Sequence, residues 1–208
     1  MLYSRSFHSQ GDRTSASTWT VHLDRVHSEW SPVLRYTDYV LFGIGPWYTI
    51  ADPKKRHYMV GNKERPNMHH LTAMQTALHT VARFTRSINY SGMPMLLTYS
   101  PVHNHVRVNS TAPELGCSSF MRPVAADALQ GAEWATDARE ARNAQIEVMQ
   151  QAKEFKVLDV TALSAFRPDG HLQNHCESKK AVDCLHWCIP GIPDTWSDII
   201  YSYVMEYM

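Results

Sequence analysis

The sequence predicts an α/β fold in which a parallel sheet is covered by helices on both faces. Short apolar runs typical of buried strands alternate with segments that have helical periodicity, in the order strand, helix, strand, helix, strand, helix. This alternation favours parallel strands, because each helix returns the chain to the edge from which the previous strand started. The 208 residues, 44% of them apolar, are enough for one domain with a full core.

Three apolar runs predict the strands. Residues 38–43 form a run that stops at Gly43, residues 95–99 precede a Ser-Pro pair, and residues 157–160 form the third run. Ligands of parallel α/β sheets bind beyond the carboxyl ends of the strands. We therefore expect functional residues directly after these three runs.

Three segments predict the helices. Apolar residues recur at helical spacing over 71–88, residues 124–155 are rich in Ala, Glu and Gln, and Asp194 is a suitable N-cap for a final helix. A short helical turn is expected at 162–166. Residues 51–69 and 167–192 are predicted to be loops, and residues 1–20 a flexible N-terminal segment that precedes one domain over 21–208.

The charge balance excludes some partners. Lys and Arg together number 20, and so do Asp and Glu, so the chain lacks the basic excess that nucleic acid or anionic membranes attract. No apolar run reaches the roughly 18 residues of a membrane span, and the first residues have no apolar signal-peptide core. We expect no targeting segment and no membrane span in this chain.

The cysteines and two glycosylation sequons nevertheless suggest secretion. The four cysteines are Cys117, Cys176, Cys184 and Cys188, and four cysteines allow three pairings. The sequons begin at Asn89 and Asn109. Either a targeting segment lies upstream of this gene model, or the chain is cytosolic and its cysteines stay reduced.

The segment most suited to chemistry is Asp183-Cys184-Leu185-His186-Trp187-Cys188. A catalytic histidine needs a carboxylate that fixes its tautomer and stabilises its charged form, and Asp183 is three residues from His186. The alternative is a polar loop pinned by two cysteines, since an Asp-x-x-His motif alone is weak evidence.

Other candidates are weaker. Two zinc sites can be drawn. One, from His103 and His105, has no obvious third ligand, and the other, from Cys176, Cys184, His186 and Cys188, has no usual ligand spacing, so we expect no metal. Trp47, Trp187 and Trp196 are candidates for stacking on sugar rings, with burial in the core as the alternative, and Trp187 is the one expected near the site. Asp159 is expected to be a hydrogen-bonding residue at a strand end, and Asp169 to belong to a turn.

At these motifs the sequence resembles the plant trichome birefringence-like family, the polysaccharide O-acetyltransferases with a PC-esterase, SGNH-hydrolase-like fold, and most of all its xyloglucan-acetylating branch. The resemblance runs from about residue 20 to the C-terminus. It is carried by Asp183–Gly191 with Asp194-x-Trp196, Leu158–Thr161, Arg167–His171, Tyr99-Ser100-Pro101-x-His103, and His22–Val26 with Trp30.

The resemblance implies a three-layer α/β sandwich and a Ser-His-Asp mechanism in which Asp183 and His186 are catalytic. It implies a polysaccharide acceptor of the xyloglucan or xylan type and a location in the Golgi lumen, and we expect Trp47, His103 and Trp187 to bind the substrate. It implies no bound cofactor, with an acetyl donor as co-substrate.

The chain also departs from the family pattern. It contains no Gly-Asp-Ser, the block that carries the nucleophile, and Gly11-Asp12-Arg13 is no substitute for it. The family's Gly-His-Trp element reads Gly45-Pro46-Trp47, and its cysteine near residues 61–66 is absent. We therefore expect the C-terminal part of an acetyltransferase domain that lacks its first strand and helix and is catalytically incomplete. The alternative is a non-catalytic carbohydrate-binding or structural relative, with zinc as a stabilising metal.

Overall fold

The computed structural model of the chain divides into two compact units. It describes residues 19–49, 56–104, 106, 113, 115–129, 133–172 and 183–207. The first unit is Met1–Leu97 with Asn143–Val157, and the second is Thr98–Arg142 with Leu158–Met208. One long helix, α3 (Glu133–Gln151), contributes its first half to the second unit and its second half to the first.

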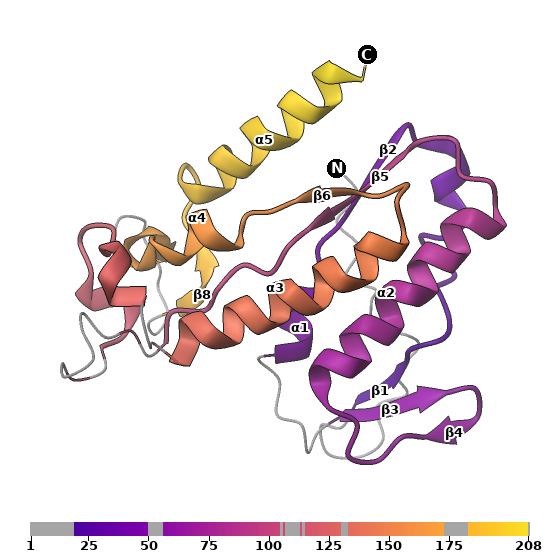
Figure 1. The fold of residues 1–208 in the computed structure, drawn as a ribbon, viewed down its shortest axis with the longest axis horizontal. Helices are drawn as coiled ribbons and strands as arrows, with labels where there is room; N and C mark the ends of the chain where they lie inside the picture. Colours follow the sequence, from indigo (N-terminus) through magenta and orange to yellow (C-terminus); the bar gives the residue numbers. More distant parts are fainter. Residues whose placement is uncertain are drawn as a thin grey trace. The chain divides into compact units, whose positions relative to one another are not determined.

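The first unit contains two three-stranded sheets (Figure 1). The elements of this unit, in which β6 lies with all but its last residue, are β1 (Trp19–His22), η1 (Val33–Tyr36), β2 (Tyr39–Phe42), α1 (Gly45–Thr49), β3 (Arg56–Val60), β4 (Lys63–Glu64), α2 (His70–Ser87), β5 (Met93–Leu97) and β6 (Lys156–Leu158). The strand orders are β1-β3-β4 and β2-β5-β6. The pairs β1/β3 and β2/β5 are parallel, which confirms the predicted parallel pairing, and β3/β4 is antiparallel.

Helix α2 lies beside the second half of α3, and the two helices run in the same direction (Figure 1). Near its start, Gln75 donates to the Glu147 carboxylate at 2.9 Å, and near its end, Arg86 forms an ion pair with Glu154 at 2.7 Å. An adjoining face of α2 is apolar, and Leu78 on that face is fully buried. The helix is thus held by an apolar face and by polar contacts, as its periodicity predicts.

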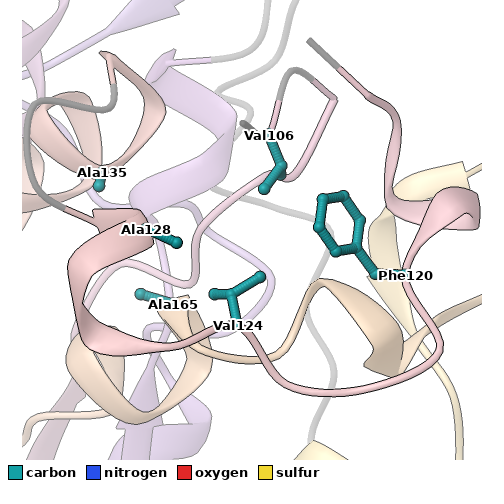
Figure 2. Packing of buried hydrophobic residues seen from close by; sticks show 6 residues of the cluster. All are labelled: Val106, Phe120, Val124, Ala128, Ala135 and Ala165. Atoms are coloured by element: carbon teal, nitrogen blue, oxygen red, sulfur yellow. The ribbon is translucent and has the colours of Figure 1, made fainter. Parts of the chain in front are cut away.

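The second unit is built from short elements. They are η3 (Cys117–Ser119), η4 (Ala126–Leu129), α4 (Thr161–Ala165), η5 (Pro168–Gly170), β7 (His171–Leu172), β8 (Asp183–Trp187) and α5 (Ile192–Glu206). Figure 2 shows its hydrophobic cluster, which consists of Val106, Phe120, Val124, Ala128, Ala135 and Ala165. The cluster contains three alanines and one aromatic residue, so the segments around it approach one another closely.

A threonine knot fixes the chain where β5 and β6 end. The Thr98 backbone N–H donates to the Leu158 carbonyl at 3.0 Å, and its hydroxyl donates to Asp159 at 3.1 Å. The same hydroxyl oxygen accepts the Val160 N–H at 3.0 Å. The Thr161 hydroxyl donates to the Tyr99 carbonyl at 2.6 Å. The residues that follow β5, which include Ser100, are therefore anchored to those that follow β6.

The structure confirms the 71–88 helix, the 38–43 strand and the short turn at 162–166. Two predicted loops are wrong, because β3 and β4 lie within 51–69, and β7 and β8 lie within 167–192. Strand β3 was missed because Tyr58 is its only fully buried side chain, which leaves little apolar signal.

Two helix starts also differ from prediction. A single helix from residue 124 is wrong, because residues 126–129 form a 3-10 turn and α3 begins at Glu133. The final helix begins one turn earlier than predicted, with Gly191 as its N-cap. Asp194 is its third residue and accepts the Gly191 backbone N–H at 2.5 Å. Among the described residues, no helix combines the length and apolarity needed to cross a bilayer.

The packing of α2 gives a stability prediction. Leu78→Ala should lower the free energy of unfolding by about 2–5 kcal/mol, because Leu78 is fully buried and its truncation leaves a cavity. Urea unfolding followed by circular dichroism measures the loss. The control is Thr72→Ala at an exposed position of the same helix, where a change within about 0.5 kcal/mol is expected. Equal stabilities of the two variants would contradict the packing.

Candidate active site

Asp183 and His186 both lie on β8, at a place where the strand is irregular. In a regular strand, residues three apart point to opposite faces. Here His171 pairs with Trp187 and Leu172 pairs with Asp183, so two residues of β7 span five positions of β8. The extra residues form a bulge, which re-aims side chains and here turns Asp183 and His186 toward each other.

The Asp183 carboxylate accepts three N–H groups. Its Oδ1 accepts the backbone N–H groups of Leu185 and His186, both at 3.0 Å, and its Oδ2 accepts the His186 ring Nδ1 at 2.6 Å. Burial raises the pKa of the carboxyl, but the His186 backbone N–H, the His186 ring and the Leu185 N–H lower it by more in sum. The pKa of Asp183 is therefore below its ordinary value, and the group is a carboxylate near neutral pH.

The His186 ring is oriented as a general base requires. Because a carboxylate can only accept, Nδ1 carries the proton toward Asp183, and in the neutral ring Nε2 is the acceptor. The His186 side chain is 66% exposed, whereas Asp183 is 30% exposed. The arrangement thus presents an acceptor nitrogen to solvent, with its tautomer set from behind by a carboxylate.

Covalent and backbone contacts hold β8 within the pair and after it. Cys184 forms a disulfide with Cys117, with a Cα–Cα distance of 5.5 Å, and Cys188 is also disulfide-bonded. The His103 N–H donates to the Cys184 carbonyl at 3.1 Å, and the Cys188 N–H donates to the Gly170 carbonyl at 2.9 Å. The backbone is therefore fixed at Cys184, which lies between the two residues of the pair, and at Cys188, which follows them.

The disulfides overturn one of the zinc sites drawn from the sequence. Zinc binds cysteine as the thiolate, and the sulfurs of Cys184 and Cys188 are in disulfides instead. The Cys3His site is therefore not formed, and its fourth residue, Cys176, lies outside the described residues. The other site drawn from sequence included His105, which also lies outside them.

Trp187 faces inward, beside the exposed His186. Its indole N–H donates to the Ser100 hydroxyl at 2.7 Å, and its ring stacks on His171 with a centroid distance of 4.0 Å. A Cβ at Gly170 would lie 3.2 Å from the Trp187 ring, so the indole packs directly on the backbone there. Trp196 contacts Trp187 edge-on at 5.9 Å. Trp187 is near the pair, as expected, but much of its ring surface contacts protein.

The other predicted site residues lie in different surroundings. His103 is fully buried, and its Nδ1 lies 2.6 Å from His171 Nε2. Burial leaves its ring no access to a polysaccharide in this conformation, so a direct substrate contact does not follow from the structure. Trp47 lies in α1 of the first unit and is 52% exposed, whereas every other residue of the site belongs to the second unit.

The two further carboxylates have structural partners. Asp159 accepts Arg142 Nε at 2.7 Å and the Thr98 hydroxyl, which confirms its place as a hydrogen-bonding residue at a strand end. Asp169 is buried in the short 3-10 helix η5 and accepts two N–H groups of Arg167, at 2.9 and 3.1 Å. Neither is part of the pair at Asp183.

Sequence reasoning assigned no role to His171 or Ser100, although both lie in the motifs that carry the family resemblance. His171 joins the pair because its Nδ1 lies 3.0 Å from the His186 carbonyl oxygen. The sequence feature that could have indicated a role is the position of each residue, since His171 ends the Arg167–His171 motif and Ser100 follows a predicted strand. Their partners are 15 and 87 residues away in sequence, a separation that local patterns do not reveal.

Comparison with known families gives a match over nearly the whole chain. The model of the family described as "PC-Esterase: GDSL/SGNH-like Acyl-Esterase family found in Pmr5 and Cas1p" matches residues 2–203. The match includes both units and all the residues of the pair and its surroundings.

Individual relatives agree with the family match. The chain is 28% identical to xyloglucan O-acetyltransferase 1 of Arabidopsis thaliana over 90% of its own length and 47% of that protein. It is 29% identical to protein trichome berefringence-like 7 of the same plant, over 88% of the chain and 39% of that protein. Xyloglucan O-acetyltransferase 1 of Populus trichocarpa is 25% identical over 90% of the chain and 48% of that protein. The chain thus spans about half the length of these relatives or less.

The lowered pKa of Asp183 predicts a pH-dependent stability. The carboxylate form is favoured by folding, so its contribution is present above the ordinary pKa of 3.8 and is lost as pH falls through the lower folded value. Asp183→Asn should reduce the free energy of unfolding by about 1 kcal/mol at pH 6, and by progressively less below pH 3.8. Urea titrations at several pH values measure the difference. Asp198→Asn, at an exposed position of α5, controls for the lost charge, and a gap that widened on acidification would contradict the assignment.

Proposed function

Because the chain belongs to the PC-esterase family of GDSL/SGNH-like acyl-esterases, we propose that it forms the Asp-His part of an O-acetyltransferase acting on cell-wall polysaccharide. The observation that carries the proposal is the Asp183–His186 contact of 2.6 Å, which leaves Nε2 of an exposed imidazole as the proton acceptor. Two relatives that are named xyloglucan O-acetyltransferase 1 support the reaction class.

The first half of the proposed reaction loads the enzyme. His186 Nε2 takes the proton of a serine hydroxyl as the serine oxygen attacks the acetyl carbonyl of the donor. The bond between the acetyl carbon and the donor's leaving atom breaks, and the leaving group takes the proton from His186. Asp183 stabilises the imidazolium that exists between these two transfers, because its Oδ2 already accepts the Nδ1 proton.

The second half transfers the acetyl group. A sugar hydroxyl loses its proton to His186 Nε2 and attacks the acetyl-serine ester, and the serine oxygen leaves with the proton that His186 returns. Water in place of the sugar would give hydrolysis by the same steps, so acceptor binding must decide between transfer and esterase activity. The exposure of Trp47 suits a ring that stacks on a pyranose, and we propose it for acceptor binding.

The nucleophilic serine of the proposed reaction is not identified within these 208 residues, because they contain no Gly-Asp-Ser. The proposed reaction therefore requires a nucleophile from elsewhere in the protein. Sequencing the transcript upstream of Met1 tests this requirement, and an apolar strand ending in Gly-Asp-Ser is the expected result. Its absence would favour the second candidate, a non-catalytic carbohydrate-binding relative, which the missing motif supports.

The compartment and the co-substrate follow from the same proposal. The Cys117–Cys184 disulfide is typical of proteins that fold in an oxidising compartment, and a Golgi lumen location agrees with it. The reaction needs an acetyl donor and an acceptor of the xyloglucan or xylan type. It needs no bound cofactor, because the serine bears the acetyl group, the histidine transfers the protons and the aspartate stabilises the imidazolium.

Replacement of the imidazole tests the function directly. His186→Ala, in the protein expressed from its complete transcript, should lower kcat for acetyl transfer to xyloglucan or xylan oligosaccharides by about a thousandfold or more. The reason is that no other group takes the serine proton. Mass spectrometry of the acetylated oligosaccharides measures transfer, and free acetate measures hydrolysis.

The matched control is His69→Ala, which removes an exposed imidazole of the first unit and should leave kcat within about twofold. Undiminished transfer by His186→Ala would exclude the proposed mechanism. Loss of both transfer and hydrolysis in His186→Ala, with both retained in His69→Ala, is the result that supports it.

A further inference from the structure

A pair of buried imidazoles lies behind the active-site strand, and the proposed reaction does not use it. His171 on β7 and His103 are both fully buried. Their rings are joined by a contact of 2.6 Å between His171 Nε2 and His103 Nδ1. Buried histidines that contact each other require a definite arrangement of protons, because each ring nitrogen either donates or accepts.

The shorter outer contact selects that arrangement, because two neutral rings leave one N–H for the two outer carbonyl oxygens. His171 Nδ1 lies 3.0 Å from the His186 carbonyl oxygen, which can only accept, so Nδ1 carries the proton. A neutral His171 then has Nε2 as acceptor, and His103 must donate to it from Nδ1. His103 therefore selects the tautomer of His171 that can hold the His186 carbonyl.

In this arrangement the third contact joins two acceptors, so it receives no N–H. His103 Nε2 lies 3.2 Å from the Ala165 carbonyl oxygen, the longest of the three separations. Two neutral imidazoles have two N–H groups in total, and the two shorter contacts use both. Burial lowers the pKa of His171 to about 4 and that of His103 to about 3, so both rings are neutral near pH 7.

Aromatic packing holds the His171 ring in place. The ring stacks on Trp187 at 4.0 Å with an interplanar angle of 24°, and Trp187 is itself fixed by its hydrogen bond to Ser100. His103 contacts Trp187 edge-on at 5.7 Å. The Nδ1–H of His171 therefore has little freedom to turn away from the His186 carbonyl.

We propose that His171 is a positioning residue for His186, and that His103 acts through His171 by setting its tautomer. The proposal rests on the proposed function of His186. The backbone N–H of His186 donates to Asp183 and its carbonyl accepts from His171. Both peptide groups that flank the His186 Cα are thereby fixed. Only the side-chain torsions remain to set the direction of the imidazole, which its Nδ1 contact with Asp183 holds. A misplacement of about 1 Å at such a group costs about a hundredfold in rate.

Two amide variants of similar chemistry separate positioning from packing. In His171→Asn the side-chain NH2 lies near the place of Nδ1 and can donate to the His186 carbonyl. In His171→Gln the longer side chain carries its NH2 toward the place of Nε2, away from that carbonyl. Both lose the stacked ring, so only the hydrogen bond distinguishes them.

The first measurement needs no catalysis. Hydrogen exchange of the His186 and Leu185 amides, followed by NMR in the 208-residue chain, should be about tenfold faster in His171→Gln than in His171→Asn. The reason is that the turn onto Asp183 opens when the carbonyl is released. Equal exchange rates in the two variants would overturn the positioning role.

The second measurement uses the protein from its complete transcript. His171→Gln should lower kcat for acetyl transfer by about 10- to 100-fold with KM within about twofold, and His171→Asn should retain kcat within about threefold of the wild-type value. Equal loss in the two variants would show that the ring matters only for packing. If His186→Ala remains active while the amide exchange differs as expected, the proposed function fails but the structural contact stands.

A second inference comes from a different part of the chain, the sequon Asn89-Tyr90-Ser91 between α2 and β5. Asn89 and Ser91 are exposed, and Asn89 has a φ of 49°, which turns the chain out of the helix. Tyr90 is anchored instead, with its N–H donating to the Thr85 carbonyl at 3.0 Å and its hydroxyl 3.2 Å from the Thr37 hydroxyl. The acceptor amide therefore lies at the surface, where an attached sugar meets no packed side chain.

We infer that Asn89 carries an N-linked glycan. The Cys117–Cys184 disulfide provides independent support, because disulfides form in the same oxidising pathway in which such glycans are attached. The chain, secreted from a eukaryotic cell behind a cleavable signal peptide, should lose one glycan in Asn89→Gln and in Ser91→Ala and keep it in Ser91→Thr. Asn109→Gln is introduced throughout, because Asn109 begins a second sequon that lies outside the described residues. Peptide mass spectrometry that finds unmodified Asn89 in the folded, secreted protein would overturn the inference.

Discussion

The geometry of the site depends on one carboxylate that accepts three N–H groups within a bulged strand. Asp183 binds the backbone of Leu185 and His186 as well as the His186 ring, so it shapes the turn and orients the base at the same time. The turn coincides with a register shift, in which His171 and Leu172 pair with Trp187 and Asp183 at the two ends of β8. A local defect in strand pairing thus creates the arrangement that the chemistry requires.

The surroundings of the turn are rigid for reasons that lie far away in sequence. The Cys117 disulfide and the His103 N–H fix Cys184 between Asp183 and His186, and the Gly170 carbonyl fixes Cys188 after them. The threonine knot at Thr98 anchors the segment that presents Ser100 to Trp187. Each of these contacts joins elements that a local pattern treats separately, and together they fix the backbone that carries the exposed imidazole.

The sequence predicted what has a strong local signal. Helix α2 was predicted from its periodicity, and the contact between Asp183 and His186 from a spacing of three residues. Strand β3 was missed because most of its side chains stay partly exposed, and β8 because its polar residues and irregular register resemble a loop. The contact of His171 with the His186 carbonyl could be found only from the structure, since the fold brings the two residues together. A direct substrate contact was expected of His103, but its side chain is fully buried. The motif that contains His103 indicates that the residue matters, but it does not indicate where the side chain points.

The neighbours His186 and Trp187 lie on opposite sides of the same strand, one exposed and one packed against His171. Side chains alternate along a strand, so a shift by one position would carry an indole outward and an imidazole inward. Single-residue insertions or deletions between Asp183 and Trp187 should therefore be far more damaging than point substitutions at Leu185. The length of this short stretch is a more stringent constraint on the evolution of the protein than the identity of its intervening residues.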